Sequence, residues 1–393
     1  MSMNATPNAE RVHIGIFGRR NSGKSSIINA ITGQNTAIVS DFAGTTTDPV
    51  YKQMELLPLG PVVFIDTAGL DDEGDLGRMR VEKTYGVLNK TDIAIVCTDI
   101  KTGIGDLEKK LIEKIEEKNI PFIVVRNKAE NFGDFTPEYP KDIKVSAKTG
   151  ENIEKLKHLL ADFEKKNEKR LVGDLIEKGD IVLLVIPIDE SAPKGRLILP
   201  QQQTIRDILE SGGVALSVKD TELSGLLKVM STPKLVITDS QAFNKVSKIV
   251  PENIPLTSFS ILFSRYKGEL IKMTESAKKV DSLSDGDKVL IAEGCTHHRQ
   301  CEDIGTVKIP RLITEKTGKK IDFEFVSGGD FPQDLKKYKL IIHCGGCTLN
   351  ENEIKNRISS AEKQGTFITN YGMLIAHLNG ILERSVKSLR KDK

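Results

Sequence analysis

The sequence has no tryptophan, few aromatic residues, five cysteines and little net charge. Its 57 Lys and Arg are almost matched by 55 Asp and Glu, which leaves a formal charge of +2. Proteins that bind nucleic acid in bulk are usually strongly basic, so this balance disfavours that class of function. It does not exclude a local basic face. The hydrophobic share of 38% is ordinary for a globular protein, and 393 residues are enough for two or three domains.

Long apolar runs are also missing. No stretch approaches the roughly 20 apolar residues that a membrane-spanning helix needs. The N-terminal MSMNATPNAER lacks the apolar core of a signal peptide. We therefore expect a soluble cytoplasmic protein without a membrane partner, in a compartment where thiols stay reduced and can bind metal.

Cysteine and histidine are concentrated near the C-terminus, where four of the five cysteines and four of the six histidines fall in the last hundred residues. Two segments, each directly after an apolar strand, carry the pattern: Cys295-Thr296-His297 and His343-Cys344-Gly345-Gly346-Cys347. Two thiols with glycines between them can converge on one soft metal. An inert buried pair, a redox dithiol and a structural zinc stay open, since spacing does not choose between zinc and iron. We favour an iron–sulfur cluster.

A phosphate-binding loop is predicted near the N-terminus. Residues 18–25 read G-x-x-x-x-G-K-S between an apolar strand, 12–18, and a helix, 26–31. Its glycines let backbone N–H groups turn toward phosphate oxygens at the positive end of the helix. Lys24 would meet the β- and γ-phosphates, and Ser25 would ligate Mg²⁺. The residues of this loop predicted to bind nucleotide are Asn21, Ser22, Gly23, Lys24, Ser25 and Ser26.

Two companion motifs follow in order. Thr46, in the stretch Gly44-Thr45-Thr46-Thr47-Asp48, is expected to close over the γ-phosphate and to contact Mg²⁺. Asp66 ends an apolar strand and would hold Mg²⁺ through water, while the amide of Gly69 would sense the γ-phosphate. The predicted catalytic residues are Lys24, Thr46, Asp66 and Gly69.

A guanine-reading motif completes the set. Asn127-Lys128-Ala129-Glu130 follows a strand and resembles the N-K-x-D motif of GTPases, with Glu130 in place of the aspartate. A carboxylate one methylene longer can still accept two N–H groups from guanine, so the expected nucleotide is GTP. The loop predicted to back the base is Ser146, Ala147 and Lys148.

The first domain resembles the Era and TrmE branch of translation-factor-like GTPases. Leu70 stands where Ras-like enzymes have the glutamine that orients water. In that branch an asparagine at the position of Asn21 helps to bind K⁺, whose charge replaces an arginine finger. The resemblance therefore implies potassium-stimulated hydrolysis, and a plain loop-capping role for Asn21 stays open.

Strands alternate with helices along the whole chain, which predicts an α/β protein of three domains, each a mainly parallel sheet with crossover helices, the first with the P-loop GTPase fold. The expected domains are residues 1–168, 170–265 and 266–393. The middle domain carries no site motif, so self-association is inferred for it by exclusion. Its predicted strands are Ile181–Ile186, Val214–Val218, Leu235–Thr238 and Leu256–Phe263. Ligands of open parallel sheets bind beyond the carboxyl ends of strands, where the cysteines of the third domain fall.

The whole chain resembles the HydF family of FeFe-hydrogenase maturation GTPases. The stretches that carry this resemblance are Ile186-Pro187-Ile188-Asp189, Leu199-Pro200-Gln201-Gln202-Gln203, Gly294-Cys295-Thr296-His297-His298 and His343-Cys344-Gly345-Gly346-Cys347. Glu130 departs from the usual guanine motif, and Cys301 has no role in the family's metal motif.

The resemblance implies a scaffold. It places a 4Fe-4S cluster on Cys295, Cys344 and Cys347, with His297 and His343 as the fourth ligand or near the open position. It also implies a transient di-iron precursor as cargo, a homodimer formed by the middle domain, the radical-SAM maturases HydE and HydG as partners, and delivery to apo FeFe-hydrogenase. From the residues alone, a carboxylate, water, a foreign ligand or Cys301 stays open as the fourth ligand.

Two rival interpretations remain. One is a TrmE/Era-like regulatory GTPase with a zinc-binding domain that contacts RNA, and the other is a structural zinc domain on a GTP switch. The first requires a basic surface studded with aromatic residues. The near-neutral charge disfavours this RNA-binding interpretation. Phe323 and Phe325 alternate along the chain and are expected to be core residues rather than surface residues.

Overall fold

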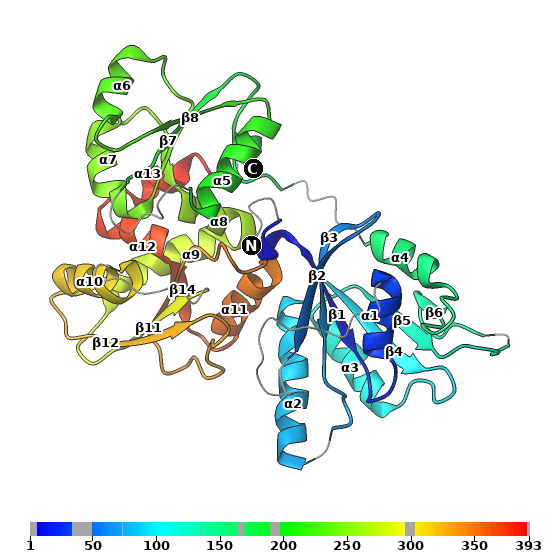
Figure 1. The fold of residues 1–393 in the computed structure, drawn as a ribbon. Helices are drawn as coiled ribbons and strands as arrows, with labels where there is room; N and C mark the ends of the chain where they lie inside the picture. The colour runs from blue at the N-terminus through cyan, green and yellow to red at the C-terminus, as the bar shows by residue number, and fades with distance from the viewer. Residues whose placement is uncertain are drawn as a thin grey trace. The chain divides into compact units, whose positions relative to one another are not determined.

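The computed structural model describes residues 6–33, 49–72, 74–133, 135–163, 169–188, 197–294 and 303–390. The chain divides into two compact units, Met1–Lys166 and Asn167–Lys393. Figure 1 shows a sheet covered by helices in the first unit and two further sheets in the second. Thr46 and residues 295–302 lie outside the described residues, so the predictions made for them stay untested by the structure.

The first unit contains a six-stranded sheet in the order β2-β3-β1-β4-β5-β6. All neighbouring strands are parallel except β2 and β3, which pair antiparallel. The strands are β1 (Val12–Phe17), β2 (Val50–Leu56), β3 (Gly60–Asp66), β4 (Ile93–Asp99), β5 (Phe122–Asn127) and β6 (Asp142–Lys144). The helices are α1 (Lys24–Thr32), α2 (Gly74–Val87), α3 (Asp106–Glu117) and α4 (Ile153–Ala161), with short 3-10 turns η1 (Asn8–Glu10) and η2 (Leu88–Lys90).

Helices cover both faces of this sheet, because successive strand residues point to opposite sides. Ile14 and Ile16 pack in one buried cluster with the apolar residues of α1 and α4. Val63 and Ile65 pack in a second cluster with those of α3. Strands buried on both faces explain the nearly continuous apolar runs in the sequence, and the predicted P-loop GTPase fold is confirmed.

The second unit contains two four-stranded parallel sheets, ordered β10-β9-β7-β8 and β12-β11-β13-β14. The strands of the first are β7 (Ile181–Val185), β8 (Val214–Val218), β9 (Leu235–Thr238) and β10 (Leu256–Ser258). Those of the second are β11 (Lys288–Glu293), β12 (Asp322–Ser327), β13 (Leu340–His343) and β14 (Phe367–Asn370). The parallel α/β class predicted from the alternation of strands and helices is confirmed.

One continuous buried cluster serves both of these sheets. Strand residues from β7 and β9 belong to the same cluster as those from β11 and β13. The helices are α5 (Leu199–Glu210), α6 (Leu223–Val229), α7 (Phe243–Ile249), α8 (Phe259–Lys267), α9 (Leu270–Ala277), α10 (Ile309–Thr317), α11 (Glu351–Lys363), α12 (Tyr371–Leu378) and α13 (Leu382–Lys387). The shorter turns are η3 (Gly173–Leu175), η4 (Ser240–Ala242), η5 (Lys278–Ser282) and the π-helical η6 (Ile304–Lys308).

The predicted strand Leu256–Phe263 is wrong beyond Ser258, where helix α8 begins. The Ser258 hydroxyl accepts the backbone N–H of Ile261 at 3.3 Å and so caps the helix. Most of the first turns of α8 are buried, including Phe259, Leu262 and Phe263. A short run that is apolar all round carries no periodicity to separate a strand from a helix.

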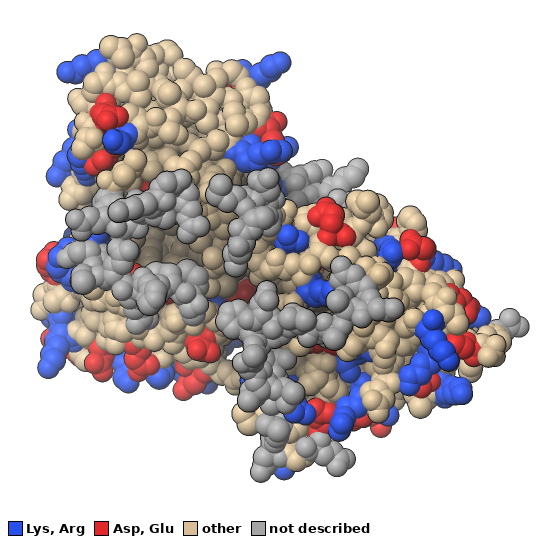
Figure 2. All heavy atoms as spheres, viewed as in Figure 1, with Lys and Arg blue, Asp and Glu red and all other residues tan. Residues whose placement is uncertain are grey.

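In the described part of the chain, no helix combines the length and apolar character needed to cross a bilayer. On the face shown in Figure 2, the Lys and Arg side chains that are drawn in blue are interspersed with Asp and Glu side chains. This mixture agrees with the small net charge of the sequence.

Candidate functional site

The phosphate loop turns tightly between β1 and α1. Gly18 has φ +151° and Gly23 has φ +92°, so both lie where residues with side chains are strained. A Cβ on Gly18 would stand 2.1 Å from the carbonyl oxygen of Cys97, and one on Gly23 would stand 2.2 Å from Nδ2 of Asn127. Both glycines are therefore required by the packing of the loop against β4 and β5.

Lys24 begins α1 and is buried, with 8% of its surface exposed. Its ammonium donates to the carbonyl oxygens of Gly18 at 3.0 Å and Arg19 at 2.8 Å. Burial lowers the pKa of Lys24, and the neighbouring Asp66 opposes that shift. A partly desolvated cation held inside the loop is well suited to bind a polyanion.

Ser25 and Asp66 form the candidate magnesium site. The Ser25 hydroxyl donates to Oδ2 of Asp66 at 2.5 Å. Burial raises the pKa of Asp66, and the Ser25 hydrogen bond partly offsets the rise. The other oxygen, Oδ1, is buried and has no hydrogen-bond partner among the described residues. Two adjacent oxygen donors, one with an unsatisfied atom, fit a hard cation such as Mg²⁺.

The loop after β3 is tied to the phosphate loop. The backbone N–H of Leu70 donates to the Gly18 carbonyl at 3.2 Å, and that of Arg20 donates to Oδ1 of Asp71 at 2.7 Å. A Cβ on Gly69 would stand 2.4 Å from Cγ of Arg20. Asp71 lies outside the sequence motifs, and its role depends on a contact with a residue 51 positions earlier in the chain.

Asn127 joins the loops on the side predicted to bind guanine. Its Nδ2 donates to the Ser22 carbonyl at 3.1 Å, and its Oδ1 accepts the N–H of Ala147 at 3.1 Å. The pKa of Glu130 is lowered by hydrogen bonds from its own backbone N–H and from the Ser146 hydroxyl. The longer side chain of Glu130 thus reaches the Ser146–Lys148 loop.

The remaining predicted loop residues are placed as follows. Asn21 is exposed with φ +58°, and Ser26 is exposed on α1. Lys128 has φ +62°, and its ammonium lies 3.0 Å from Oδ2 of Asp99. Cys97 is fully buried, as expected for a core residue, and its thiol donates to the Ser22 carbonyl at 3.3 Å.

Strands β11 and β13 are parallel neighbours, and Ala292 pairs with His343 in their register. The segments that follow the two strands therefore leave the same edge of the sheet. The N–H of Gly294 donates to Sγ of Cys344 at 3.0 Å, and the N–H of Gly346 approaches the same sulfur at 3.4 Å. Burial raises the pKa of Cys344 to about 11, against the effect of these N–H groups.

Cys347 completes the described thiol pair. Burial raises the pKa of this thiol, and the positive charge of Lys267 acts in the opposite direction. Gly346 has φ +64°, and a Cβ there would stand 2.6 Å from Cδ1 of Ile354. Glycine is therefore needed between the two cysteines for the loop to turn against α11.

Both ring nitrogens of His343 have partners. Nδ1 lies 2.8 Å from the carbonyl oxygen of Cys344, and Nη1 of Arg357 donates to Nε2 at 2.9 Å. Since arginine only donates, Nδ1 carries the proton. Burial, followed by the charge of Arg357, lowers the pKa of His343 to about 3. Metal ligation by His343 would require one of these hydrogen bonds to break.

The described residues contain no group of three or more His, Cys, Asp or Glu placed to hold a metal. The other half of the motif, Cys295 and His297, falls in 295–302, as do His298 and Cys301. The sulfurs of Cys344 and Cys347 nonetheless suit a soft metal or cluster, because sulfur is a soft ligand, and the backbone N–H groups and the lysine charge partly offset the effect of burial on the two thiols.

The sequence motifs did not predict the roles of Lys267 and Arg357. Lys267 donates to the carbonyl oxygens of the cysteine loop, and Arg357 bonds His343. Both are more than nine-tenths buried. In the sequence, Lys267 and Arg357 are basic residues within helices that also carry apolar residues. That pattern does not indicate which residues they contact.

The six-stranded sheet, phosphate loop and guanine-side loops define a P-loop GTPase joined to a unit of two parallel sheets. Residues 13–128 match a family model described as 50S ribosome-binding GTPase. Residues 171–268 match the hydrogen maturase F dimerization domain, and residues 271–388 match the hydrogen maturase F tetramerization domain. These last two models cover more than half of the sequence, and the chain belongs to the hydrogen maturase F family. The resemblance to HydF is confirmed.

Curated relatives are similar over the GTPase domain. GTPase Der of Nautilia profundicola is 36% identical over 183 residues, which are 42% of this chain and 40% of that protein. The tRNA modification GTPase MnmE of Laribacter hongkongensis is 31% identical over 158 residues, 39% of this chain and 35% of that protein. The chain thus spans well under half of the length of these relatives.

Two solved structures are also similar to this chain. A variant of Aquifex aeolicus Era bound to GDP.AlF4- gives a TM-score of 0.35 at 19% identity, covering 53% of this chain and 92% of that one. The G domain of the T. maritima FeoB iron transporter gives 0.32 at 19% identity, covering 40% and 100%.

Proposed function

We propose that this chain is a GTPase and scaffold of FeFe-hydrogenase maturation, which holds a 4Fe-4S cluster and delivers a di-iron precursor to the apo-hydrogenase. The observation that carries the proposal is the joining of a phosphate-loop GTPase unit to two hydrogen maturase F domains. In this proposal residues 1–168 bind GTP, 170–265 form the homodimer, and 266–393 hold the cluster.

For nucleotide binding, Lys24 exchanges its carbonyl partners for the β- and γ-phosphates. Ser25 and Asp66 would hold Mg²⁺, which would neutralise charge at the phosphates. Thr46 and the amide of Gly69 contact the γ-phosphate. Asn127, Lys128 and Glu130 face guanine, with residues 146–148 behind the base.

Water must be positioned without a glutamine, since Leu70 is buried and apolar. We assign Asn21, exposed at the turn of the phosphate loop, to a K⁺ whose charge offsets that developing between the phosphates. GTPase rates measured in K⁺ and in Na⁺ test this role, with Asn21→Ala as the variant. Equal rates in the two salts would remove the ion from the mechanism.

We assign Cys295, Cys344 and Cys347 as ligands of the cluster. The contacts described for Cys344 and Cys347 support these two, and the contact of Gly294, the residue before Cys295, supports the third. The Gly294 N–H donates to the Cys344 sulfur, and Cys295 follows Gly294 in the sequence. His297 and His343 are the candidates for the fourth ligand or its neighbourhood. Incomplete protein ligation of one iron would allow cargo to leave without breaking a bond to a cysteine.

The cargo is a di-iron precursor built with the radical-SAM maturases HydE and HydG. γ-Phosphate contacts that order the Thr46 loop would couple GTP state to partner exchange. The names of both hydrogen maturase F models support oligomerisation, and we propose that residues 170–265 form the homodimer.

Anaerobic reconstitution with iron and sulfide, followed by metal analysis and EPR, tests the cluster. We expect iron and sulfide in a ratio typical of a 4Fe-4S cluster and an EPR signal on reduction. A protein that takes up zinc and shows no cluster signal would support the rival zinc domain. Activation of apo-hydrogenase by the loaded protein then tests the carrier role.

A further inference from the structure

Gly69 lies where the loop after β3 meets the phosphate loop. The residue is buried, and a Cβ added to it would stand 2.9 Å from the backbone nitrogen of Arg20 and 2.9 Å from Oδ1 of Asp71. Contacts this close leave no room for a side chain, so the junction of the two loops requires a glycine. The backbone of Gly69 therefore lies directly beside the phosphate loop.

Two hydrogen bonds from the residues that directly follow Gly69 hold this junction together. The N–H of Leu70 donates to the Gly18 carbonyl at 3.2 Å. The Oδ1 atom of Asp71 accepts the backbone N–H of Arg20 at 2.7 Å. The second bond has a carboxylate as its acceptor, and such bonds are shorter and stronger than those between neutral groups. Together the two bonds fix where the Gly69 amide stands relative to the phosphate loop.

The two arginines of the phosphate loop are held differently. Nε of Arg19 lies 2.9 Å from Oε1 of Glu108, a buried carboxylate in the first turn of α3, so this ion pair ties the loop to α3. The Arg20 side chain is 69% exposed, and its Nε lies 3.6 Å from Oδ1 of Asp72. An exposed ion pair at that distance contributes little. The short backbone bond to Asp71 is therefore the stronger link between Arg20 and the loop after β3.

We propose that Asp71 is a positioning residue for GTP binding, which accepts the Arg20 N–H and so holds the Gly69 amide where it can donate to the γ-phosphate. The inference rests on the proposed contact between Gly69 and the γ-phosphate. GDP has no γ-phosphate, so its binding does not depend on Asp71. The Asp71 contact therefore favours binding of the triphosphate over the diphosphate.

The test compares Asp71→Ala with Asp71→Asn in the full chain. Asp71→Ala removes the acceptor, whereas Asp71→Asn keeps an amide oxygen that can accept the same N–H. The Kd values of mant-GDP and of mant-GMPPNP, a GTP analogue that is not hydrolysed, are measured by fluorescence titration with Mg²⁺ present. Asp162→Ala is the matched control, since Asp162 is an exposed aspartate at the end of α4 that pairs with Lys141. Thermal unfolding of each protein checks that it is folded.

We expect Asp71→Ala to weaken mant-GMPPNP binding about tenfold and to leave the Kd of mant-GDP within about twofold of wild type. Asp71→Asn and Asp162→Ala should bind both nucleotides as wild type does. Unchanged mant-GMPPNP binding in Asp71→Ala would overturn the proposal. Tighter binding would also overturn it, because the Asp71 contact would then oppose engagement of the γ-phosphate.

The remaining outcomes separate positioning from a general structural role. Equal weakening of both nucleotides in Asp71→Ala would mean that Asp71 supports the whole loop, which overturns the proposal. A loss in Asp71→Asn as large as that in Asp71→Ala would overturn it as well, since the acceptor oxygen would not be what matters.

Gly69→Ala tests the contact on which the inference rests, because its methyl group would displace the amide. Unchanged mant-GMPPNP binding in Gly69→Ala would show that the proposed γ-phosphate contact is absent. If wild type binds neither nucleotide, the proposed GTP-binding function fails instead.

Discussion

At the scale of single residues, the ammonium groups of Lys24 and Lys267 are bound in the same way. Each is a buried lysine whose ammonium donates to backbone carbonyls of a loop. For Lys24 the loop is the one expected to surround phosphates, and desolvation has already lowered its pKa. A phosphate that replaces those carbonyls would supply the opposite charge that a desolvated cation lacks.

Lys24→Ala should reduce GTP hydrolysis by a factor on the order of 100 or more, because a charge that stabilises the transferred phosphoryl group is removed. Cluster iron should be unchanged, since the hydrogen bonds that the structure describes for the Lys24 ammonium go to the phosphate loop. Turnover assays and iron analysis on the same preparation check both parts. The control is Lys110→Ala, an exposed lysine on α3. Hydrolysis near the wild-type rate in Lys24→Ala would contradict the assigned role.

The two lysines differ in how far the sequence could predict them. Lys24 lies in a contiguous motif, and its partners are five and six residues away, so local pattern was sufficient. The Lys267 ammonium donates to residues 79 to 82 positions further along the chain, and Arg357 of α11 donates to His343 of β13. Contacts of that range depend on tertiary packing, which no local pattern records.

At the scale of elements, α8 shows where local pattern fails. Its apolar residues are buried on several sides, so the run resembles a strand as well as a helix. Ser258 decides the outcome as the N-cap, and its hydroxyl also accepts a hydrogen bond from Ser240 at 3.1 Å. The predicted strand Leu256–Phe263 contains this capping serine.

Ser258→Ala should lower the free energy of unfolding of the second unit by about 1 kcal/mol, because the first turn of α8 loses its side-chain cap. Hydrogen exchange of the α8 amides, together with calorimetric unfolding, checks the effect. Ser247→Ala is the control, since Ser247 is a half-buried serine inside α7 and does not cap that helix. Unchanged exchange in α8 would show that the cap does not stabilise the helix.

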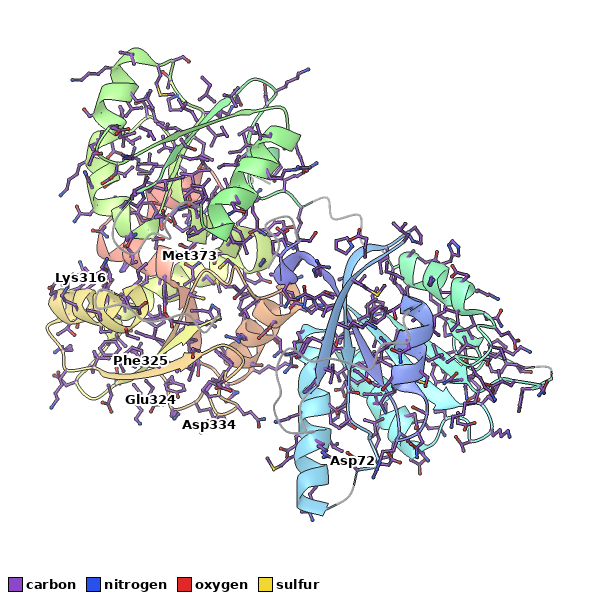
Figure 3. All side chains as sticks on the ribbon, viewed as in Figure 1. Asp72, Lys316, Glu324, Phe325, Asp334 and Met373 are labelled. Carbon is purple, nitrogen blue, oxygen red and sulfur yellow. The ribbon has the colours of Figure 1, made fainter. Side chains whose placement is uncertain are left out.

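Strand β12 forms one edge of the last sheet, and Figure 3 labels Glu324 and Phe325 on it. Phe325 is 38% exposed, so its expected core position is wrong, whereas Phe323 packs against the buried cluster. Glu324 accepts hydrogen bonds from Tyr338, Lys337 and Lys288, which lower its pKa to about 2. This network joins β12 to its neighbours.

The Glu324 network predicts acid sensitivity. The ordinary pKa of the Glu324 carboxyl is 4.5, and its pKa in the folded protein is about 2. The stabilisation that the network provides is therefore complete above pH 4.5 and is lost as the pH falls toward 2. Glu324→Gln should therefore lose less stability than wild type across this window. The effect should be small and shrink with salt, because the carboxylate is partly exposed.

Thermal unfolding of the two proteins from neutral pH down to about pH 2 measures this difference. Glu315→Gln, at an exposed position on α10, is the control. Parallel pH profiles for wild type and Glu324→Gln would show that the carboxylate makes no net contribution.

At the scale of the whole molecule, the alternation of strands and helices was enough to predict three mainly parallel sheets, because buried parallel strands are apolar enough to stand out in the sequence. The antiparallel strand β2 and the shared core of the last two sheets were not predicted. Which faces of separate sheets pack together depends on side-chain fit, and neither composition nor periodicity specifies it.

The compact first and second units predict that nucleotide and metal functions can be separated by mutation. Cys344→Ser should lose cluster iron, because a hydroxyl is a poor ligand for a soft metal and the N–H groups of Gly294 and Gly346 would face an oxygen. GTP turnover should stay within about twofold of wild type, since the phosphate loop is untouched.

Cys97→Ser is the reciprocal control for Cys344→Ser. It makes the same exchange at a buried thiol that supports the Ser22 carbonyl of the phosphate loop, so it should disturb GTP turnover and leave iron content unchanged. Iron analysis and turnover measured for both variants complete the comparison. Full iron content in Cys344→Ser would refute its assignment as a ligand, and parallel losses in both variants would indicate general unfolding rather than two separate sites.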